Sequence, residues 1–286
     1  MRIGLTLEGG GMRGMYTAGV IDVMMENDIR FDIAVGVSAG ALFGCNYKSH
    51  QIGRVIRYNK RFCQNKRYAS IQNWIKTGDL YNKEFAYHIV PSQLDVFDTD
   101  TFAKDPMEFY VVCTNADTGL PVYHKCDKGD YDDIEWMRAS GAIPIVFKMV
   151  NIDGQKYVDG GVSDSIPVRW MKKQNVDKQV VVLTRPLGYR KKLMNNFKAI
   201  ALILKSYPRL VETLKNRHIM YNNTLEEIAL MEKNNEAFVI RPSSNISLKT
   251  MEKDPDRLEE VYQLGRKDML ARLDELKEYI KRSCNE

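Results

Sequence analysis

Short apolar runs alternate with amphipathic segments over the first part of the chain. The apolar runs end in glycine or polar residues and predict strands at 2–7, 31–37, 108–113, 156–158 and 179–183. Stretches with helical periodicity lie between these runs, at 15–26, 39–47, 132–139 and 167–173. Since strands and helices alternate, the pattern predicts an α/β fold with a mostly parallel central sheet and helices on both of its faces.

The pattern changes after Pro186. Residues 193–206 and 209–233 are predicted to form long helices separated by Pro208, a strand is expected at 237–240, and 255–281 carries a periodic apolar stripe. The sequence therefore predicts a first domain over 1–185 and a largely helical C-terminal extension over 186–286 that packs on it.

Composition places the chain among ordinary globular proteins. With 286 residues, 44% hydrophobic and 28% charged, it can bury a substantial core. It has no run of about 18 apolar residues, so no transmembrane segment is expected, and its first residues lack the features of a signal peptide. The scattered cysteines form no Cys-x-x-Cys pair, which argues against a disulfide framework or a zinc site; they are Cys45, Cys63, Cys113, Cys126 and Cys284. A cytoplasmic location is expected, although a leaderless exported protein would have the same composition.

Basic residues are concentrated in two blocks, although the net charge is only +5. Residues 41–78 contain eight Lys or Arg and no acid, and residues 187–220 contain eight with Glu212 as the single acid. Such blocks attract anionic lipid, so peripheral membrane contact through both is one expectation. The alternative is that packed helices hold these side chains in solvent. No recognition module accompanies the charge, so nucleic acid is not an expected partner.

A glycine-rich segment, Gly9-Gly10-Gly11-Met12-Arg13-Gly14, follows the first predicted strand. Its glycines match the G-x-G-x-x-G loop that holds the phosphates of a dinucleotide. That fold places an acidic residue after the second strand to bind a ribose, whereas this chain has Val37 and Ser38 there. The other interpretation is an oxyanion hole, in which consecutive backbone amides face the negative oxygen of an acyl-transfer intermediate. The neighbouring serine favours the oxyanion hole.

The serine lies in Gly36-Val37-Ser38-Ala39-Gly40, between a predicted strand and a predicted helix. A Gly-x-Ser-x-Gly turn in this context holds the hydroxyl out from the end of a sheet, and the glycines allow the tight backbone. Ser38 is therefore a candidate nucleophile that needs a base. The alternative is a tight connection without chemistry.

Two kinds of base are available. Of the four histidines, only His218 follows Asp159, as the Ser–acid–His order of α/β-hydrolases requires, and it lies in a basic helical segment. Asp159-Gly160-Gly161 follows a predicted strand, so this carboxylate can take the Ser38 proton directly, although Asp-Gly-Gly is also a common hairpin turn.

The three motifs, in this order and at this spacing, resemble those of patatin-like phospholipases over residues 1 to about 185. The segments 139–144 and 165–167 are similar to those that flank the family's catalytic aspartate, and 181–186 is similar to a bacterial branch. The resemblance implies a three-layer α/β/α fold and a Ser–Asp dyad, with Ser38 as nucleophile and Asp159 as general base. It also implies an oxyanion hole, the turn around the serine and the turn after the base; these involve Gly9, Gly10, Gly11, Met12, Arg13, Gly14 and Ala39, then Gly36 and Gly40, then Gly160 and Gly161.

The expected function is hydrolysis of phospholipid or other acyl esters through an acyl-enzyme, with no metal and no organic cofactor. Arg13 is expected to orient the loop or attract an anionic headgroup, and a structural salt bridge is the alternative. Two other functions stay open: a non-catalytic lipid-binding or regulatory protein on the same fold, and a Ser/Asp/His esterase for soluble esters.

Overall fold

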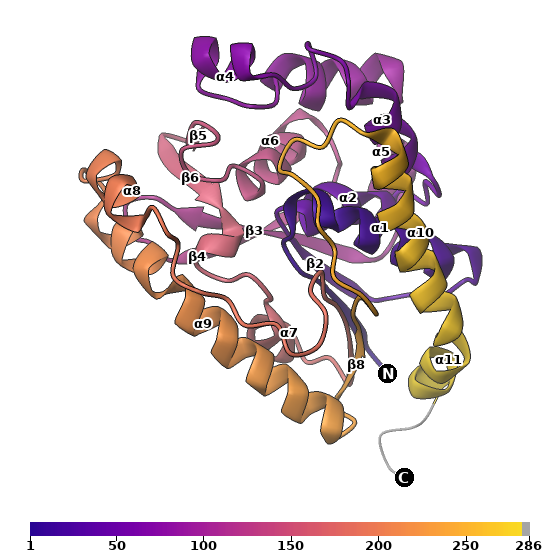
Figure 1. Cartoon of the computed structure of the whole chain (residues 1–286). Coiled ribbons are helices and arrows are strands. Elements are labelled where there is room, and N and C mark those ends of the chain that lie inside the picture. Colours follow the sequence, from indigo (N-terminus) through magenta and orange to yellow (C-terminus); the bar gives the residue numbers. More distant parts are fainter. Residues whose placement is uncertain (282–286) are drawn as a thin grey trace.

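A mixed β-sheet forms the centre of the molecule, and helices cover both of its faces (Figure 1). The computed structural model describes residues 1–281, so Cys284 lies outside the described residues. The strands are β1 (Ile3–Leu7), β2 (Ile33–Val37), β3 (Glu108–Asn115), β4 (Pro121–Cys126), β5 (Val150–Ile152), β6 (Gln155–Asp159), β7 (Lys178–Val182) and β8 (Ala237–Ile240). They are hydrogen-bonded in the order β5-β6-β3-β2-β1-β7-β8, and β4 also pairs with β3. The three-layer α/β/α prediction is confirmed.

The helices include three short elements of tighter or wider pitch. The α-helices are α1 (Gly14–Glu26), α2 (Ala39–Lys48), α3 (Arg54–Phe62), α4 (Ile71–Thr77), α5 (Thr99–Lys104), α6 (Tyr131–Ser140), α7 (Val168–Lys172), α8 (Phe197–Ile203), α9 (Pro208–Lys233), α10 (Pro255–Ala271) and α11 (Leu273–Lys281). The 3₁₀-helices are η1 (Gly11–Arg13) and η3 (Gly160–Val162), and η2 (Lys83–Leu94) is a π-helix. Within the described chain, no helix is both long enough and apolar enough to span a bilayer.

Successive side chains along each strand point to opposite faces of the sheet, so each face has its own hydrophobic cluster. Leu5 and Val182 pack in the cluster that also contains α1 and α10, whereas Val181 and Val239 pack with residues of α7 and α9. This period of two is what a sheet covered on both faces requires. The parallel pairs β1–β2, β1–β7, β2–β3 and β7–β8 form the central part, and the pairs that involve β4, β5 and β6 are antiparallel.

One edge of β3 carries two strands that meet head to head. β2 runs parallel to β3 and ends with Val37 opposite Val112, while β6 runs antiparallel and ends with Asp159 opposite Cys113. β4 pairs with the same stretch of β3 and occupies its other edge. The residue after β2 and the last residue of β6 are therefore neighbours in space.

The C-terminal region is built into the same sheet. β8 pairs in parallel with β7, and α10 packs closely on α1, where a Cβ on Gly265 would lie 2.1 Å from the carbonyl oxygen of Tyr16. Figure 1 shows α9 along one face and α10 along the other. The division at 185/186 stays a prediction.

The long helix predicted over 193–206 is wrong: α8 contains only Phe197–Ile203. Residues 190–194 before it have no regular structure, and the Asn222 side chain of α9 fixes Lys191 there: it accepts from the Lys191 amide at 2.8 Å and donates to the Lys191 carbonyl oxygen at 3.0 Å. The prediction for 209–233 is confirmed by α9.

Candidate active site

Ser38 lies in a strained turn between β2 and α2. Its backbone has φ 54° and ψ −118°, a conformation that costs an L-residue of order 1–3 kcal/mol and is concentrated at functional sites. The turn is tight enough that a Cβ on Gly40 would lie 2.4 Å from the Leu7 carbonyl oxygen, and one on Gly36 would lie 2.3 Å from that of Gly40. The Gly-x-Ser-x-Gly spacing thus has a steric cause.

The Ser38 hydroxyl donates a hydrogen bond to Asp159 Oδ2 at 2.7 Å. Both side chains are buried, with Ser38 6% and Asp159 4% exposed. The other carboxylate oxygen of Asp159 accepts from the Gly161 amide at 2.7 Å, in the turn where Gly160 and Gly161 begin η3. Burial raises the pKa of Asp159, and the nearby positive charge of Arg217 and the hydrogen bond from Ser38 oppose that rise.

Ser140 fixes the backbone of the turn. Its hydroxyl accepts from the Ser38 amide at 2.9 Å and donates to the Val112 carbonyl oxygen at 2.6 Å. Ser140 is the last residue of α6 and is fully buried. It therefore ties Ser38 to β3, a role that its place in the sequence segment 139–144 did not reveal.

The glycine loop presents a set of unpaired amides. Within residues 1–281, the amides of Gly10, Gly11 and Met12 have no hydrogen-bond acceptor, and neither does that of Ala39 at the start of α2. Gly11 has φ +54°, which suits glycine, and a Cβ there would meet nothing within 4 Å, so backbone conformation rather than space favours glycine.

The other loop amides are occupied. Gly9 donates to the carbonyl oxygen of Ser165, Arg13 to that of Gly10, and Gly14 to those of Gly11 and Met12. Of the six loop residues expected at an oxyanion hole, three therefore have an amide available for one.

In the described chain, no histidine forms a hydrogen bond with Ser38 or Asp159. His50 pairs with Asp105, His88 with Glu135, and His124 with Asp133, while a ring nitrogen of His218 lies 3.0 Å from the Lys215 carbonyl oxygen. A buried carboxylate is thus the hydrogen-bonded partner of the serine.

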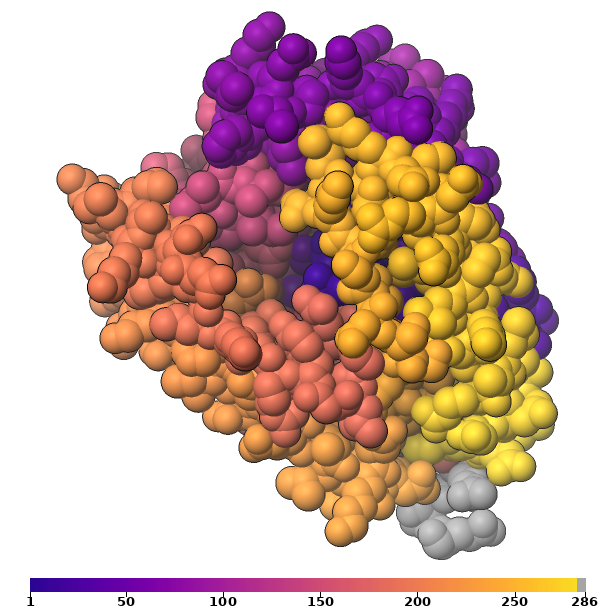
Figure 2. Space-filling view, viewed as in Figure 1, coloured from indigo at the N-terminus to yellow at the C-terminus, as the bar shows by residue number. Residues whose placement is uncertain are grey.

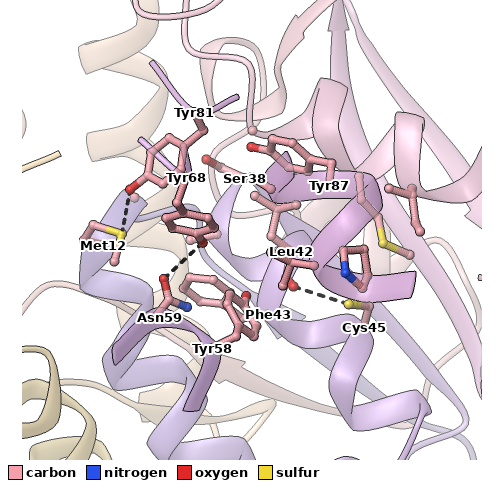
Figure 3. Close-up of a pocket in the computed structure, with 18 of the residues that line it drawn as sticks. Met12, Ser38, Leu42, Phe43, Cys45, Tyr58, Asn59, Tyr68, Tyr81 and Tyr87 are labelled. Atoms are coloured by element: carbon pink, nitrogen blue, oxygen red, sulfur yellow. Dashed lines mark hydrogen bonds between the residues drawn. The ribbon is translucent and has the colours of Figure 1, made fainter. Parts of the chain in front are cut away.

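Ser38, Gly11 and Met12 lie between two cavities. The first, of about 140 Å³, is apolar and is shown in Figure 3. Its walls come from α2, α3, η2 and α6 and include Leu42, Phe43, Tyr58, Tyr68, Tyr87 and Val90. A cavity of this kind accommodates a hydrocarbon chain.

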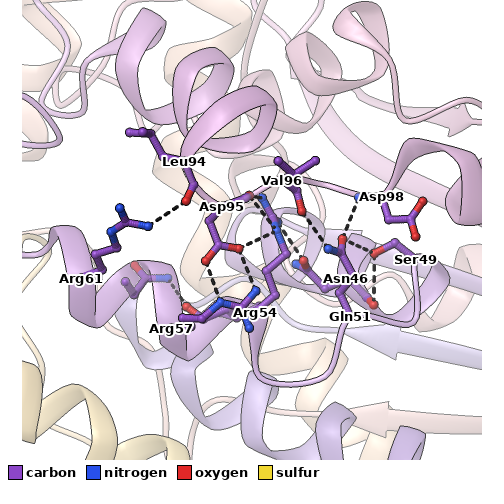
Figure 4. Close-up of polar contacts among 12 residues, drawn as sticks. Asn46, Ser49, Gln51, Arg54, Arg57, Arg61, Leu94, Asp95, Val96 and Asp98 are labelled. Atoms are coloured by element: carbon purple, nitrogen blue, oxygen red, sulfur yellow. Dashed lines mark hydrogen bonds and ion pairs between the residues drawn. The ribbon is translucent and has the colours of Figure 1, made fainter.

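One wall of the apolar cavity contains a buried arginine, Arg54. Its guanidinium donates to Asn46 Oδ1 at 2.9 Å and to the Asp95 carbonyl oxygen at 2.7 Å, and it pairs with the Asp95 carboxylate at 3.3 Å (Figure 4). Asp95 also binds Arg57 through both oxygens, at 2.7 and 2.8 Å. The network joins α3 to the end of η2 and gives the buried Arg54 a counterion that it shares with Arg57.

The second cavity, of about 270 Å³, is basic. Figure 2 shows a hollow whose floor is formed by N-terminal residues, between the chain near 190 and the chain near 250. The lining includes Ser38 and Asp159 together with Arg13, Arg185, Lys191, Arg217 and Lys249. We call these five basic residues the cation cluster. Sequence reasoning named only Arg13 among them as a site residue.

One group of side chains in the described chain has the composition of a metal site. His124, Cys126 and Asp133 place one ligand atom each within 4.8 Å of one another. Asp133 already accepts from the amides of Lys128 and Gly129, and His124 stacks on Trp136 with ring centroids 4.2 Å apart. None of the three lines the cavities beside Ser38.

Comparison with known proteins gives a family match over residues 5–170, to the patatin-like phospholipase model, and a second match over 207–281 to a domain of unknown function, DUF6363. An uncharacterized Escherichia coli protein, YjjU, is 32% identical over 194 residues, which are 65% of this chain and 52% of that protein. The lysophospholipase nte1 of Aspergillus terreus is 28% identical over 186 residues, which are 61% of this chain and 11% of the fungal protein. The chain thus spans about half of the first relative and about a tenth of the second. Among solved structures, VipD of Legionella pneumophila aligns with 14% identity and a TM-score of 0.47, covering 96% of this chain and 67% of VipD.

Proposed function

The chain belongs to the patatin-like phospholipase family, and we propose that it hydrolyses lipid acyl esters with Ser38 as nucleophile and Asp159 as general base. The observation that carries the proposal is the 2.7 Å hydrogen bond from the Ser38 hydroxyl to the buried Asp159 carboxylate. The apolar cavity beside Ser38 and the relatives named lysophospholipase favour a lipid as the substrate.

The first half of the reaction forms an acyl-enzyme. Asp159 accepts the hydroxyl proton as Ser38 Oγ attacks the ester carbonyl carbon. The amides of Gly10, Gly11 and Met12 donate to the oxyanion, and such donors are each worth about 10²–10³ in rate. When the intermediate collapses, the ester C–O bond breaks and Asp159 returns the proton to the leaving alcohol.

The second half hydrolyses the acyl-enzyme. Asp159 accepts a proton from water while the water oxygen attacks the acyl carbon. Collapse of that intermediate releases the fatty acid, and the proton on Asp159 passes to Ser38 Oγ. A raised pKa suits the first step of each half because it makes the Asp159 carboxylate a stronger base toward the Ser38 hydroxyl and toward water.

Hydrolysis of a medium-chain nitrophenyl ester tests the proposal. Ser38→Ala and Asp159→Asn should each lower kcat by at least 10²-fold, whereas His218→Ala should retain activity. Loss of activity in His218→Ala, with full activity in Asp159→Asn, would replace the dyad by a triad.

We also propose that α4 touches the lipid surface. Ile71, Trp74 and Ile75 on this helix are 60%, 41% and 73% exposed, and α4 lies at one extremity of the molecule (Figure 1). Exposed apolar side chains flanked by cations are typical of interfacial segments, and Lys66 and Lys76 flank these.

The rest of the basic block 41–78 contributes less to such contact. Arg54 and Arg57 share Asp95, and Lys60 pairs with Glu259, so two acids from outside the block offset two of these three positive charges. The charge available to a membrane is therefore smaller than the sequence suggested.

Co-sedimentation with vesicles of anionic and zwitterionic lipid tests the contact. Ile75→Glu should reduce the bound fraction several-fold, while Leu230→Glu, at an exposed apolar residue of α9 outside both basic blocks, should not. Equal binding of both variants and the wild type would reject α4 as the contact.

A further inference from the structure

Basic side chains from four separate segments converge on the second cavity. Arg13 comes from η1, Arg185 and Lys191 from the loop between β7 and α8, Arg217 from α9, and Lys249 from the chain before α10. Three of the five, Lys191, Arg217 and Lys249, belong to the C-terminal region, and Arg185 is the last residue of the predicted first domain. Among the described residues, Asp159 is the single acid that lines the same cavity.

Within residues 1–281, the partners of these cations are aromatic rings and a carbonyl oxygen rather than acids. The charged groups of Arg185 and Lys191 each lie 4.4 Å from a ring centroid, of Tyr189 and Tyr221 respectively, and Arg217 donates to the Gly161 carbonyl oxygen. No carboxylate forms an ion pair with any of the five in the part of the chain that the structure describes. The Nε atoms of Arg13 and Arg185 are buried without a hydrogen-bond acceptor. Such unpaired donors are rare in folded proteins because each costs the loss of its hydration.

One buried acid beside the cluster, Glu8, offsets its charge only in part: the Glu8 charge raises the pKa of Arg13 and of Lys191, but burial and neighbouring cations lower both by more. Glu8 is buried, and its two oxygens already accept from the Thr184 amide and the Tyr221 hydroxyl. Burial and the charge of Arg217 lower the pKa of Lys191 to about 8. Burial and the charge of Arg185 lower the pKa of Arg13. The cluster is therefore a set of mutually repelling cations that an anion would stabilise.

The cation cluster lies where the alcohol half of an ester substrate would be. Ser38 lies between the apolar cavity and the basic cavity, and Gly11 and Met12 line both. An ester bound at Ser38 with its hydrocarbon in the apolar cavity directs its alcohol half toward the cation cluster. Arg217, which lines the basic cavity, donates from Nε to the Gly161 carbonyl oxygen, and within the described chain its terminal nitrogens form no ion pair.

We propose that the cation cluster binds a phosphate group on the alcohol half of the substrate, so that the preferred substrate is a fatty acyl ester of glycerol with a terminal phosphate monoester. This inference rests on the proposed acyl hydrolase activity. A phosphate monoester carries close to two negative charges and three acceptor oxygens, which suit several Arg and Lys donors. A phosphocholine group offers one negative charge and would bring a fixed positive charge against Lys191 and Arg185.

The test compares three lipids with the same acyl chain in neutral detergent micelles: monoacylglycerol phosphate, monoacylglycerol phosphocholine and monoacylglycerol. For the wild type, kcat/KM for the phosphate monoester should exceed that for each of the others by about tenfold or more. Lys191→Gln and Arg185→Gln should each lower that preference several-fold. Lys192→Gln, which removes the same charge from the exposed neighbouring residue, should keep it.

A ratio near one between the wild-type kcat/KM for the phosphate monoester and that for the other lipids would overturn the inference. A fall of this ratio in Lys192→Gln equal to that in Lys191→Gln would overturn it too. If Lys191→Gln does not fold, Lys249→Gln replaces it in the test. Lys249 is exposed on the opposite wall of the cavity, and its substitution should also lower the preference for the phosphate monoester several-fold. Absence of any Ser38-dependent hydrolysis would instead reject the proposed function, because the headgroup inference predicts a ratio of rates on an active enzyme.

Inhibition of monoacylglycerol hydrolysis separates a headgroup site from a site for free phosphate. Glycerol 3-phosphate should inhibit the wild type more strongly than inorganic phosphate, and Lys191→Gln should weaken that inhibition several-fold. Inhibition by inorganic phosphate that equals or exceeds that by glycerol 3-phosphate would assign the cluster to the free anion and contradict the headgroup inference.

Discussion

Ser38 and Asp159 are brought together by a single strand, β3, although 121 residues separate them along the chain. β2 leads to Ser38 from one direction and β6 leads to Asp159 from the other, and the two strands meet on the same edge of β3 opposite Val112 and Cys113. The catalytic geometry that we propose is thus set by backbone hydrogen bonds of the sheet. Such a geometry is in place before substrate binds, which is what an efficient nucleophile–base pair requires.

The acid limb of the pH–rate profile should reflect the raised pKa of Asp159. The carboxylate must be ionised to act as base, so kcat/KM on a neutral ester should rise with pH at values above those of an ordinary aspartate, about 3.9. Arg217→Gln removes a positive charge that favours the ionised form and should move the limb to higher pH. A limb that stays in place or moves to lower pH in Arg217→Gln would contradict this electrostatic account.

Asp159→Asn should be more stable than the wild type at alkaline pH. Because the folded pKa of Asp159 is raised, the stability linked to this group is present at low pH and is lost as pH rises through the folded pKa. An amide has no charge to bury, so a gain of about 1 kcal/mol or more is expected at pH 8, or about 2–4 °C in Tm. Thermal unfolding at pH 5 and pH 8 measures it: the difference should be smaller at pH 5, and a lower Tm than wild type at pH 8 would refute the argument.

Asp95→Ala should destabilise the wall of the apolar cavity. It leaves the buried Arg54 without its carboxylate, and breaking a buried pair in this way costs about 3–5 kcal/mol. Asp127→Ala, which removes an exposed partner of Lys125, is the matched control and should cost under about 1 kcal/mol. Urea unfolding of both variants tests the contrast, and similar losses would show that the Asp95 network is not structural.

Ala86→Phe should shorten the acyl chain that the enzyme accepts. Ala86 lines the apolar cavity from η2, so an aromatic ring there occupies space that we assign to hydrocarbon. In a series of nitrophenyl esters, the chain length with the highest kcat/KM should fall, whereas Gln93→Phe, at an exposed position of η2, should leave it unchanged. An unchanged optimum in Ala86→Phe would place the acyl chain elsewhere.

The parts of the fold that depend on local pattern were predictable from sequence. β1, β2, the strained turn at Ser38 and the long α9 follow from apolar runs, glycine positions and helical period, and the structure contains all four. The π-helix η2 contains Pro91 and lies in a region without a clear period, so no local signal identified it.

Features that depend on tertiary contacts were not predictable in the same way. The charge of residues 41–78 seemed available to partners until Asp95 and Glu259, from outside that block, were seen to pair with it. The role of Ser140 depends on β3 and the turn at Ser38, which are distant in sequence. The cation cluster likewise exists only because separate segments converge on one cavity.

The most direct measurement is covalent labelling with an alkyl fluorophosphonate, followed by peptide mass mapping. We expect one adduct, on Ser38, formed at least 10²-fold more slowly in Asp159→Asn and not at all in Ser38→Ala. Labelling of another residue, or labelling of Ser38 at an unchanged rate in Asp159→Asn, would contradict the Ser38–Asp159 assignment.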